Sequence, residues 1–218
     1  MRGSPGSSAR IRRRCGHSAA LLLLCLLAAT SLVHPCAAQG AQPPSQAATD
    51  NASELGQLLQ LFGQRSHAEA RFEQSQYLAA LTRPLQSTGT LAYRAPDHLE
   101  QHIQTPRSQL LVLDHGVLSM QLGRHRHSVP LADYPQLAPL LESLRALLAG
   151  DLDGLQQHFE LRLQGPLTQW QLRLTPRSAD LSSQLREMLI RGDHAQIREV
   201  QIQQRNGDHS IMHIEPTP

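Results

Sequence analysis

Histidine pairs are the clearest metal-ligand candidates in this chain. His125 and His127 lie two positions apart in a segment expected to be a strand, so their side chains share one face. His98 and His102 share a strand face in the same way. Either pair could supply two imidazole ligands to a transition metal. No third ligand is evident beside either pair in the sequence, so we predict surface histidines without a metal.

Two further sets carry the residue types of other sites. Asp97, His115 and Ser119 have the side chains of a hydrolytic triad, but the sequence has no G-x-S-x-G motif. Asp151 and Asp153 could bind calcium, yet they lack a calcium-loop pattern and are more typical of a helix N-terminus. The chain has no lysine, which excludes Schiff-base chemistry. We therefore expect no catalytic residue, metal or cofactor, and predict that the protein is not an enzyme.

Residues 1–38 have the pattern of a cleavable signal peptide. Arginines at positions 10 and 12–14 precede an apolar run, Ala19–Val33, and small residues follow at 37–38. The run is shorter than the roughly 20 residues that a membrane-spanning helix needs. A membrane anchor and lipidation at Cys36 are the alternatives, although Pro35 is a poor neighbour for a lipidated cysteine. Cleavage predicts a periplasmic protein.

Cleavage after Ala38 would change the chemistry and charge of the chain. All three cysteines (Cys15, Cys25 and Cys36) would be removed, which excludes disulfides and thiol catalysis. Five of the 20 basic residues lie in the signal segment and none of the 18 acidic residues does. The processed chain therefore has 15 basic and 18 acidic residues, a net charge of −3 with histidine neutral. This balance argues against a nucleic-acid partner.

Apolar periodicity predicts the helices that must position any site. Residues 39–50 are a polar, proline-containing spacer expected to be disordered, and 51–218 are expected to form a single domain. A first helix should begin near Asn51, because Leu55, Leu58, Leu59 and Phe62 recur at helical spacing. A second helix should run from Tyr134 to Leu148 and end at Gly150, with a short third helix over 151–157.

Alternation with a period of two predicts strands through most of the remaining chain. We expect about nine to eleven of them, most with one apolar and one polar face. Asn206-Gly207 is the strongest hairpin signal, and Gly89 can mark a bulge. Residues 181–190 are compatible with either a helix or a strand.

The expected sheet is too wide for its helices to cover. Ten strands at about 4.8 Å span about 48 Å, whereas three helices at about 10 Å cover about 30 Å. The sheet can therefore close on itself around a filled core, or stay open with an apolar hollow that receives a ligand. Geometry alone leaves both outcomes open.

A series of short motifs, in order and at the right spacing, carries a family resemblance. They are Phe72-Glu73-Gln74, Leu85–Tyr93, Pro96–Leu99, Thr105-Pro106, Leu111–Gly116, Gly150-Asp151-Leu152, Leu172–Pro176 and Asn206-Gly207-Asp208. Together they cover about residues 53–215. The chain resembles the periplasmic outer-membrane lipoprotein carrier (LolA-like) family, in its divergent branch.

The resemblance implies an α+β, mainly β fold. It is an incomplete antiparallel β-barrel, a half-barrel with two or three helices over its concave apolar face. It also implies a monomeric periplasmic chaperone that binds the acyl chains of a lipoprotein or another lipidated product and transfers it towards the outer membrane. An inner-membrane donor, an outer-membrane acceptor and transient membrane contact are implied as partners. A non-enzymatic envelope scaffold with a filled core is the alternative.

In the carrier interpretation, apolar side chains of the lid helices and of the sheet contact the cargo. These residues are Leu55, Phe62, Phe72, Leu91, Tyr93, Leu99, Ile103, Leu137, Leu140, Leu141, Leu144, Leu148, Phe159, Leu161, Trp170 and Leu172.

Two positions depart from the family pattern. Ala95 stands where better-known members have an arginine that latches the lid, and Arg94 lies one residue earlier, on the opposite side of a strand. Gln101 stands where a tryptophan is common. Aromatic residues make up only 3% of the chain, so a hollow would be mainly aliphatic. The cargo can therefore differ from a triacylated lipoprotein, for example a glycolipid.

Overall fold

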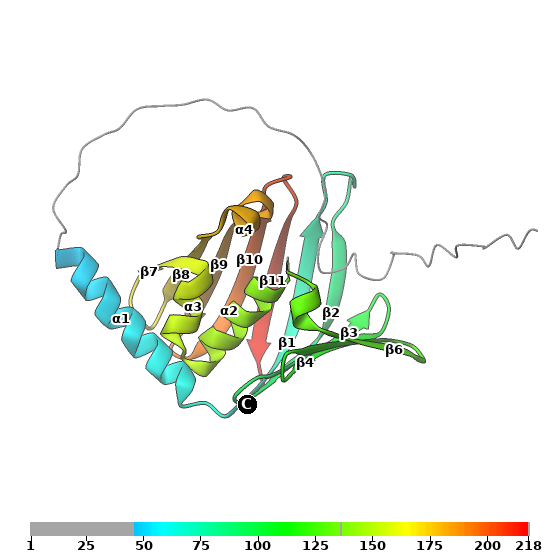
Figure 1. The fold of residues 1–218 in the computed structure, drawn as a ribbon, viewed down its shortest axis with the longest axis horizontal. Coiled ribbons are helices and arrows are strands. Elements are labelled where there is room, and N and C mark those ends of the chain that lie inside the picture. Colours follow the sequence, from blue (N-terminus) through cyan, green and yellow to red (C-terminus); the bar gives the residue numbers. More distant parts are fainter. Residues whose placement is uncertain (1–45, 136, 218) are drawn as a thin grey trace, which may run out of the picture. The chain divides into compact units, whose positions relative to one another are not determined.

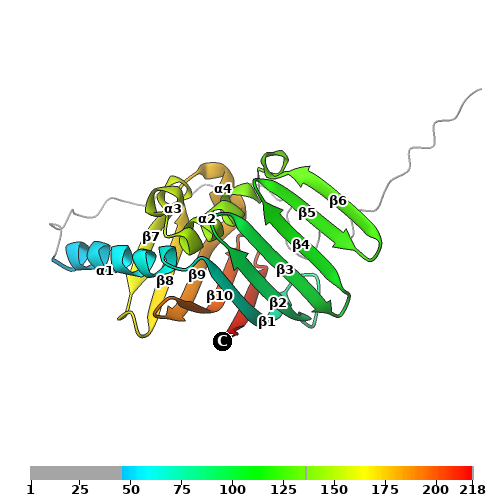
Figure 2. The same cartoon turned by 90° about the horizontal axis from the view of Figure 1, so that it is seen from below.

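One large antiparallel sheet organises the chain. The computed structural model describes residues 46–135 and 137–217. Within them, eleven strands lie in the order β6-β5-β4-β3-β2-β1-β11-β10-β9-β8-β7 (Figures 1 and 2). Among the described strands, β6 and β7 each pair on one side only, so the sheet stays open. The predicted fold class, a mainly β half-barrel with helices on one face, is confirmed.

Each strand has an antiparallel neighbour on at least one side. Their bounds are β1 His67–Tyr77, β2 Leu85–Arg94, β3 His98–Thr105, β4 Gln109–Asp114, β5 Val117–Leu122, β6 His125–Pro130, β7 Phe159–Gln164, β8 Trp170–Pro176, β9 Leu185–Asp193, β10 Gln196–Gln204 and β11 His209–Pro216.

The helices differ from the predicted ones mainly at their starts. α1 spans Gln46–Gly63, so residues 46–50 of the expected spacer are helical and the helix begins before Asn51. α2 spans Ala138–Ala149, and a short 3-10 helix, Leu131–Asp133, occupies the chain before it. The predicted start at Tyr134 is wrong because Pro139, at the first turn of α2, restricts the helix start.

The two remaining helices are short and capped by side chains. α3 spans Leu152–His158, where the Asp151 carboxylate accepts a hydrogen bond from the Gly154 N–H, so this aspartate caps a helix as expected. α4 spans Ala179–Gln184 and leads directly into β9. The ambiguous segment 181–190 is therefore helix first and strand second.

Turn chemistry explains several strand connections. His115 and Gly116 both have positive φ angles, 48° and 72°, which is the backbone of a two-residue hairpin turn between β4 and β5. The predicted hairpin at Asn206-Gly207 joins β10 to β11. The pairing of β2 with β3 shifts register between Thr88 and Gly89, so the expected bulge is present.

The N-terminal expectations lie outside this description. Residues 1–45, which hold the predicted signal peptide and most of the spacer, are not among the described residues. Every described residue belongs to one compact unit. No helix within the described part of the chain is long and apolar enough to cross a membrane.

Candidate functional site

The strand register defines one continuous side of the sheet that the helices approach. Directly opposed residues of antiparallel strands share a face. Leu172 of β8 pairs with Ile190 of β9, which pairs with Val200 of β10, which pairs with Met212 of β11. Leu172 and Ile190 are fully buried, at 0% exposure, whereas Val200 and Met212 are only half-buried. Burial therefore falls along a single row as it passes from β8 to β11.

A packed cluster fills the end of this face near β7. Leu58, Leu147 and Leu155, from α1, α2 and α3, are fully buried. They pack in one core with the inward side chains of β7, β8 and β9. Phe62 of α1 meets Trp170 of β8 edge to face, with ring centroids 6.0 Å apart. The side chains of this part of the sheet are therefore closed off from solvent by the helices.

The helices explain why this end is filled. α1 and α3 both contact β7, and α4 contacts β8 and β9. α2 packs on α1 and α3. Figures 1 and 2 show α1, α2 and α3 gathered on one face of the sheet towards its β7 end. The closest packing of helices on strands is thus with β7, β8 and β9.

The same face continues past this cover and stays partly exposed. Tyr93 is opposite Leu99, Leu99 is opposite Leu113, and Leu113 is opposite Leu118. Tyr93 and Leu113 are buried, but Leu99 and Leu118 are half-buried, and none of the four belongs to the packed cluster. We call the half-buried apolar side chains of this region the open face: Leu91, Leu99, Leu111, Leu118, Met120, Leu122, Met212 and Ile214.

α2 carries leucines that stand apart from the packed cluster. Leu147 lies in the cluster and Leu140 packs against it. Leu137, Leu141 and Leu144 are half-buried and outside the cluster. Each residue advances an α-helix by about 100°. Around the axis of α2, these three leucines therefore point between Leu147 on one side and Arg145 on the other. We call them the α2 leucines.

A pocket shows what the neighbouring side of α2 faces. It has a volume of about 420 Å³, and its walls include Glu142 and Arg145 of α2, His158 of α3 and Leu113 of β4. This side of α2 therefore faces β4, in the uncovered half of the sheet. The walls are polar as well as apolar, so the pocket lies at the edge of the open face and is not an enclosed oily cavity.

Tyr93 of β2 interacts electrostatically with Arg145 of α2. Burial raises the pKa of the Tyr93 hydroxyl, Arg145 opposes this shift, and Asp97 adds to it. The hydroxyl also donates a long, 3.5 Å, hydrogen bond to the Pro96 carbonyl oxygen. The tyrosine therefore keeps its proton at physiological pH.

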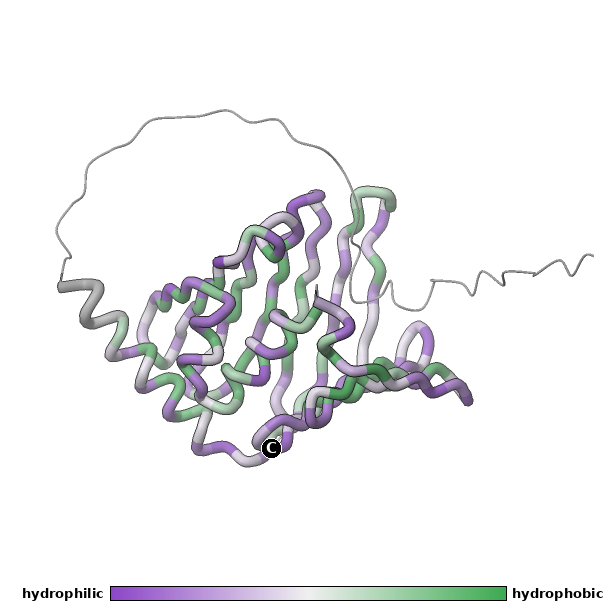
Figure 3. The backbone as a smooth tube through the Cα atoms, in the orientation of Figure 1, coloured by the Kyte–Doolittle hydropathy of each residue, from purple (hydrophilic) through white to green (hydrophobic). Residues whose placement is uncertain are grey.

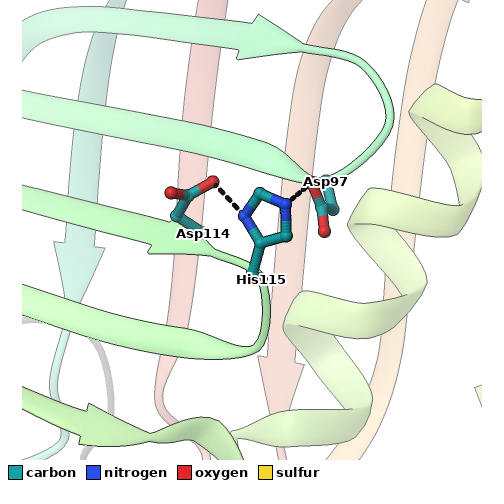
Figure 4. Close-up of side chains that lie close together, drawn as sticks. All are labelled: Asp97, Asp114 and His115. Carbon is teal, nitrogen blue, oxygen red and sulfur yellow. Dashed lines mark hydrogen bonds and ion pairs between the residues drawn. The ribbon is translucent and has the colours of Figure 1, made fainter.

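A polar cluster lies at the ends of β3 and β4. The His115 ring stands between two carboxylates, with its Nδ1 3.0 Å from Asp114 and its Nε2 4.0 Å from Asp97 (Figure 4). His98 Nδ1 lies 3.3 Å from the same Asp114 oxygen. Desolvation alone would raise the pKa of Asp114, but hydrogen bonds from His98 and His115 hold it below its usual value. The ligand atoms of Asp97, Asp114 and His115 lie close enough together to hold a cation. His115 is largely exposed, however, and the three side chains already pair with one another.

The structure separates the other candidate sets. Ser119 makes a hydrogen bond with Ser128 on β6, so it does not join Asp97 and His115 as a triad would require. His98 binds Asp114 and His102 approaches Ser108 at 3.3 Å, so this histidine pair does not converge. His125 and His127 share a face of β6, as predicted, and both are exposed.

The predicted cargo-contacting residues fall into two groups. Leu55, Phe62, Phe159, Trp170 and Leu172 belong to the packed cluster, and Leu140, Leu148 and Leu161 pack against it. The rest lie outside it: Phe72, Tyr93 and Ile103 are buried, Leu91 and Leu99 are half-buried on the open face, and Leu137, Leu141 and Leu144 are the α2 leucines.

Sequence reasoning missed the open-face residues of β4, β5 and β11. Leu111, Met120 and Met212 share the face of Leu91 and Leu99 through the strand register. Period-two alternation in 117–122 could have found Met120. Segment 109–113 is apolar on both faces, so its sequence does not indicate which leucines face the helices. Arg94 lies on the opposite face from Tyr93 and is exposed, at the end of β2.

Comparison with known proteins identifies the family. The family model for outer membrane lipoprotein carrier protein LolA-like matches residues 47–213, so the chain belongs to this family. Comparison with curated proteins returned no match.

The solved structures that match this chain have low sequence identity to it. A LolA superfamily protein from Nitrosomonas europaea has 9% identity and a TM-score of 0.43, with 76% of this chain and 91% of that chain covered. A DUF1329 family protein from Desulfovibrio piger has 10% identity and a TM-score of 0.43, with 74% and 88% covered. The MucA/MucB complex of Pseudomonas aeruginosa has 14% identity and a TM-score of 0.42, with 77% and 56% covered.

Family membership indicates a carrier-like protein that binds lipid or lipoprotein. The family is periplasmic and its members are generally not enzymes.

Proposed function

We propose that this protein is a periplasmic carrier that binds the acyl chains of a lipoprotein or another lipidated envelope product and transfers it towards the outer membrane. The acyl chains lie on the open face, against the α2 leucines. The protein acts as a monomeric chaperone without catalysis, taking cargo from an inner-membrane donor and releasing it to an outer-membrane acceptor.

The observation that supports this proposal is the change of burial along one apolar face. Leu172 and Ile190 are sealed by helices, whereas the directly continuous positions Val200 and Met212 keep exposed surface. Soluble proteins rarely leave a contiguous apolar surface uncovered unless it binds something. A flexible hydrocarbon chain suits such a surface because it follows a row of aliphatic side chains without needing matched polar groups.

Energetics favour transfer over permanent capture. Burying hydrocarbon contributes about 0.8 kcal/mol per CH₂, so two chains of about 15 carbons offer roughly 24 kcal/mol against water. That value exceeds the practical ceiling of about 21 kcal/mol for non-covalent binding. The same chains leave a bilayer at a comparable cost. Exchange between membrane and carrier is therefore nearly balanced, and donor and acceptor proteins can set its direction.

One polar group on the open face supports a cargo with more than hydrocarbon. Gln101 lies between Leu91 and Leu111 in the register of β2, β3 and β4. Its amide nitrogen is buried and has no hydrogen-bond partner among the described residues. An unpaired buried donor is costly. The ester or amide carbonyl that joins an acyl chain to its head group would accept this hydrogen bond.

The proposal is tested by native mass spectrometry of the protein purified from the periplasm. We expect added mass that corresponds to one acylated molecule per protein, released by detergent. A bare protein mass under gentle conditions would favour the competing function, an envelope scaffold that carries no lipid.

A matched pair of variants locates the bound lipid. Leu111 and Val112 are adjacent, apolar and half-buried, but they point to opposite faces of β4. Leu111→Arg should remove most of the co-purifying lipid, because it places a charge on the open face, whereas Val112→Arg should retain it. Equal lipid content in both variants would contradict binding on this face.

A further inference from the structure

A cluster of exposed apolar side chains surrounds the turn between β1 and β2. Among the described residues, four large hydrophobic side chains are exposed: Tyr77 at 39%, Leu81 at 46%, Leu85 at 38% and Val117 at 41%. The first three belong to the β1–β2 segment 77–85, which we call the apolar turn. Figure 3 colours this turn towards the hydrophobic end of its scale. The apolar turn lies at the ends of β1 and β2, and its last residue, Leu85, is opposite Gln76 on the same side of the sheet as Leu91.

The apolar turn is held in place. The Ala79 N–H donates a 2.7 Å hydrogen bond to the Asp208 carboxylate in the turn between β10 and β11. Tyr77 stacks on His209 with ring centroids 4.5 Å apart and 7° between the rings. The Leu81 N–H bonds to the Leu78 carbonyl oxygen at 2.9 Å. Leu81 is therefore presented to solvent by a fixed turn, and little ordering is needed when a partner covers it.

Arginines flank the apolar turn on both sides. Arg83 lies in the turn itself, Arg107 in the adjacent turn between β3 and β4, and Arg205 in the adjacent turn between β10 and β11. All three are exposed. Asp208, an acidic residue in contact with the apolar turn, is buried and accepts hydrogen bonds from Ala79 and Asn206. Beside the turn, these three exposed arginines face one exposed carboxylate, Asp180 of α4, the helix whose Ser182 carbonyl oxygen accepts a hydrogen bond from Arg205.

The opposite ends of the strands carry several aspartates, although Arg94 ends β2 there and Arg198 pairs with Asp193. Asp97, Asp114 and Asp193 lie at or just beyond strand ends there, and Asp133 is in the connection that follows β6. Val117, the fourth exposed apolar side chain, begins β5 at this acidic end. The net charge of the chain conceals this uneven distribution.

We propose that the apolar turn is a membrane-docking site that inserts Leu81 and Leu85 into an anionic bilayer surface while Arg83, Arg107 and Arg205 contact lipid phosphates. Apolar side chains ringed by cations match the chemistry of an anionic lipid interface. A nucleic acid would match the arginines but not the leucines, and binding to a protein partner would not depend on anionic lipid in the vesicle experiment below. The proposal goes beyond cargo binding, because the docking residues and the open face are different residues.

Vesicle co-sedimentation tests the proposal with the exported protein purified from the periplasm. We expect binding to vesicles of phosphatidylglycerol mixed with phosphatidylcholine, and much weaker binding to phosphatidylcholine alone. Leu81→Asp should weaken binding by about tenfold or more. The bilayer would no longer bury a leucine at this position, and the new carboxylate would be repelled by the negatively charged lipid phosphates. Val117→Asp is the matched control, equally exposed at the acidic end, and should bind as the parent does.

A position-specific readout shows whether the turn itself enters the bilayer. An environment-sensitive dye on Leu81→Cys should shift to the blue with anionic vesicles and be quenched by brominated acyl chains, whereas the same dye on Val117→Cys should not respond. The proposal is wrong if the parent protein ignores anionic vesicles, if Leu81→Asp binds them unchanged, or if both dyes respond alike. Competition of vesicle binding by RNA with no dye response to lipid would instead indicate a polyanion site and would also overturn it.

Docking and cargo binding fail separately in these measurements. Binding of a soluble fluorescent fatty acid should be unchanged in Leu81→Asp and reduced in Leu111→Arg. Vesicle binding should show the reverse pattern. Loss of both activities in Leu81→Asp, in a variant whose circular dichroism matches the parent, would contradict a separate docking site.

Discussion

Two regions of one sheet have similar sequences and different surroundings. On β7–β9, leucines and an isoleucine such as Leu172, Leu174 and Ile190 are completely buried by α1, α2, α3 and α4. On β2–β5 and β11, side chains of the same kind, such as Leu91 and Leu111, are only half-buried. The strand pattern alone does not separate the regions. The position of the helices does, and it divides a structural core from a surface available to cargo.

In the proposed carrier, stability and cargo binding are assigned to different strands. The covered region holds the aromatic contact between Phe62 and Trp170 and most of the fully buried side chains. The open region keeps its apolar surface because the helices are too few to cover it. A carrier needs both, since the filled region has to hold the sheet together while the open region is empty.

The largest effect should come from cavity formation in the covered region. Leu172→Ala should lower the free energy of unfolding by about 2–5 kcal/mol, because a fully buried leucine leaves a cavity. Leu111→Ala on the open face should cost less than about 1.5 kcal/mol, because solvent already reaches this position. Urea unfolding followed by circular dichroism measures both. Equal losses would show that the two regions are packed alike.

Adding volume to the covered region should also be costly. A Cβ at Gly192 would clash with the Trp170 indole ring and with the Gln196 carbonyl oxygen. Gly192→Ala should therefore destabilise the protein by about 1–3 kcal/mol. The same urea titration applies, and a neutral result would mean that the indole is free to move.

A charge among the α2 leucines should act on binding more than on folding. Leu144→Arg should weaken fatty-acid binding by about tenfold, because it removes apolar surface and introduces a cation beside the hydrocarbon. Gln171→Arg, on the opposite face of β8 from Leu172, is the control and should bind normally. Fluorescent fatty-acid titration measures both variants. The same weakening in both would mean that the faces are wrongly assigned.

Lowering the pH should reduce fold stability only slightly, and by similar amounts through the carboxylates beside the two regions. Hydrogen bonding by Arg198 lowers the pKa of Asp193 beside the covered region, and hydrogen bonding by His98 and His115, against desolvation, lowers that of Asp114 beside the open region. Each carboxylate therefore stabilises the fold above its ordinary pKa of about 3.9, and this contribution is lost as pH falls through the lower, folded-state pKa.

Melting curves at neutral pH and near pH 3 measure this acid effect. Asp193→Asn and Asp114→Asn should each reduce the acid-induced drop in melting temperature by a few degrees or less. A large effect of either substitution alone would mean that charge, and not apolar cover, distinguishes the two regions.

Much of the fold could be predicted from local patterns. Alternation located most strands, Asn206-Gly207 located the last hairpin, and Gly89 located the bulge, because each depends on a few neighbouring residues. The sequence does not predict the short helix α4, because six residues are too few to show a helical periodicity.

The candidate site was harder to predict than the strands. Leu55, Phe62 and Trp170 are predicted to contact cargo, and the structure places them in the packed cluster. Leu111 has the same side chain as Leu172 and a different environment. The difference depends on which strands the helices cover, and that is decided by contacts between residues far apart in the chain.

Photoaffinity labelling tests most directly the claim that the uncovered half of the sheet carries the cargo. A fatty acid with a photoactivatable group near the end of its chain is bound, irradiated and mapped by peptide mass spectrometry. Labels are expected on β2–β5, on β11 and on the α2 leucines, and unlabelled fatty acid should suppress them. Labels confined to the outer face of the sheet, or no specific labelling, would contradict the account.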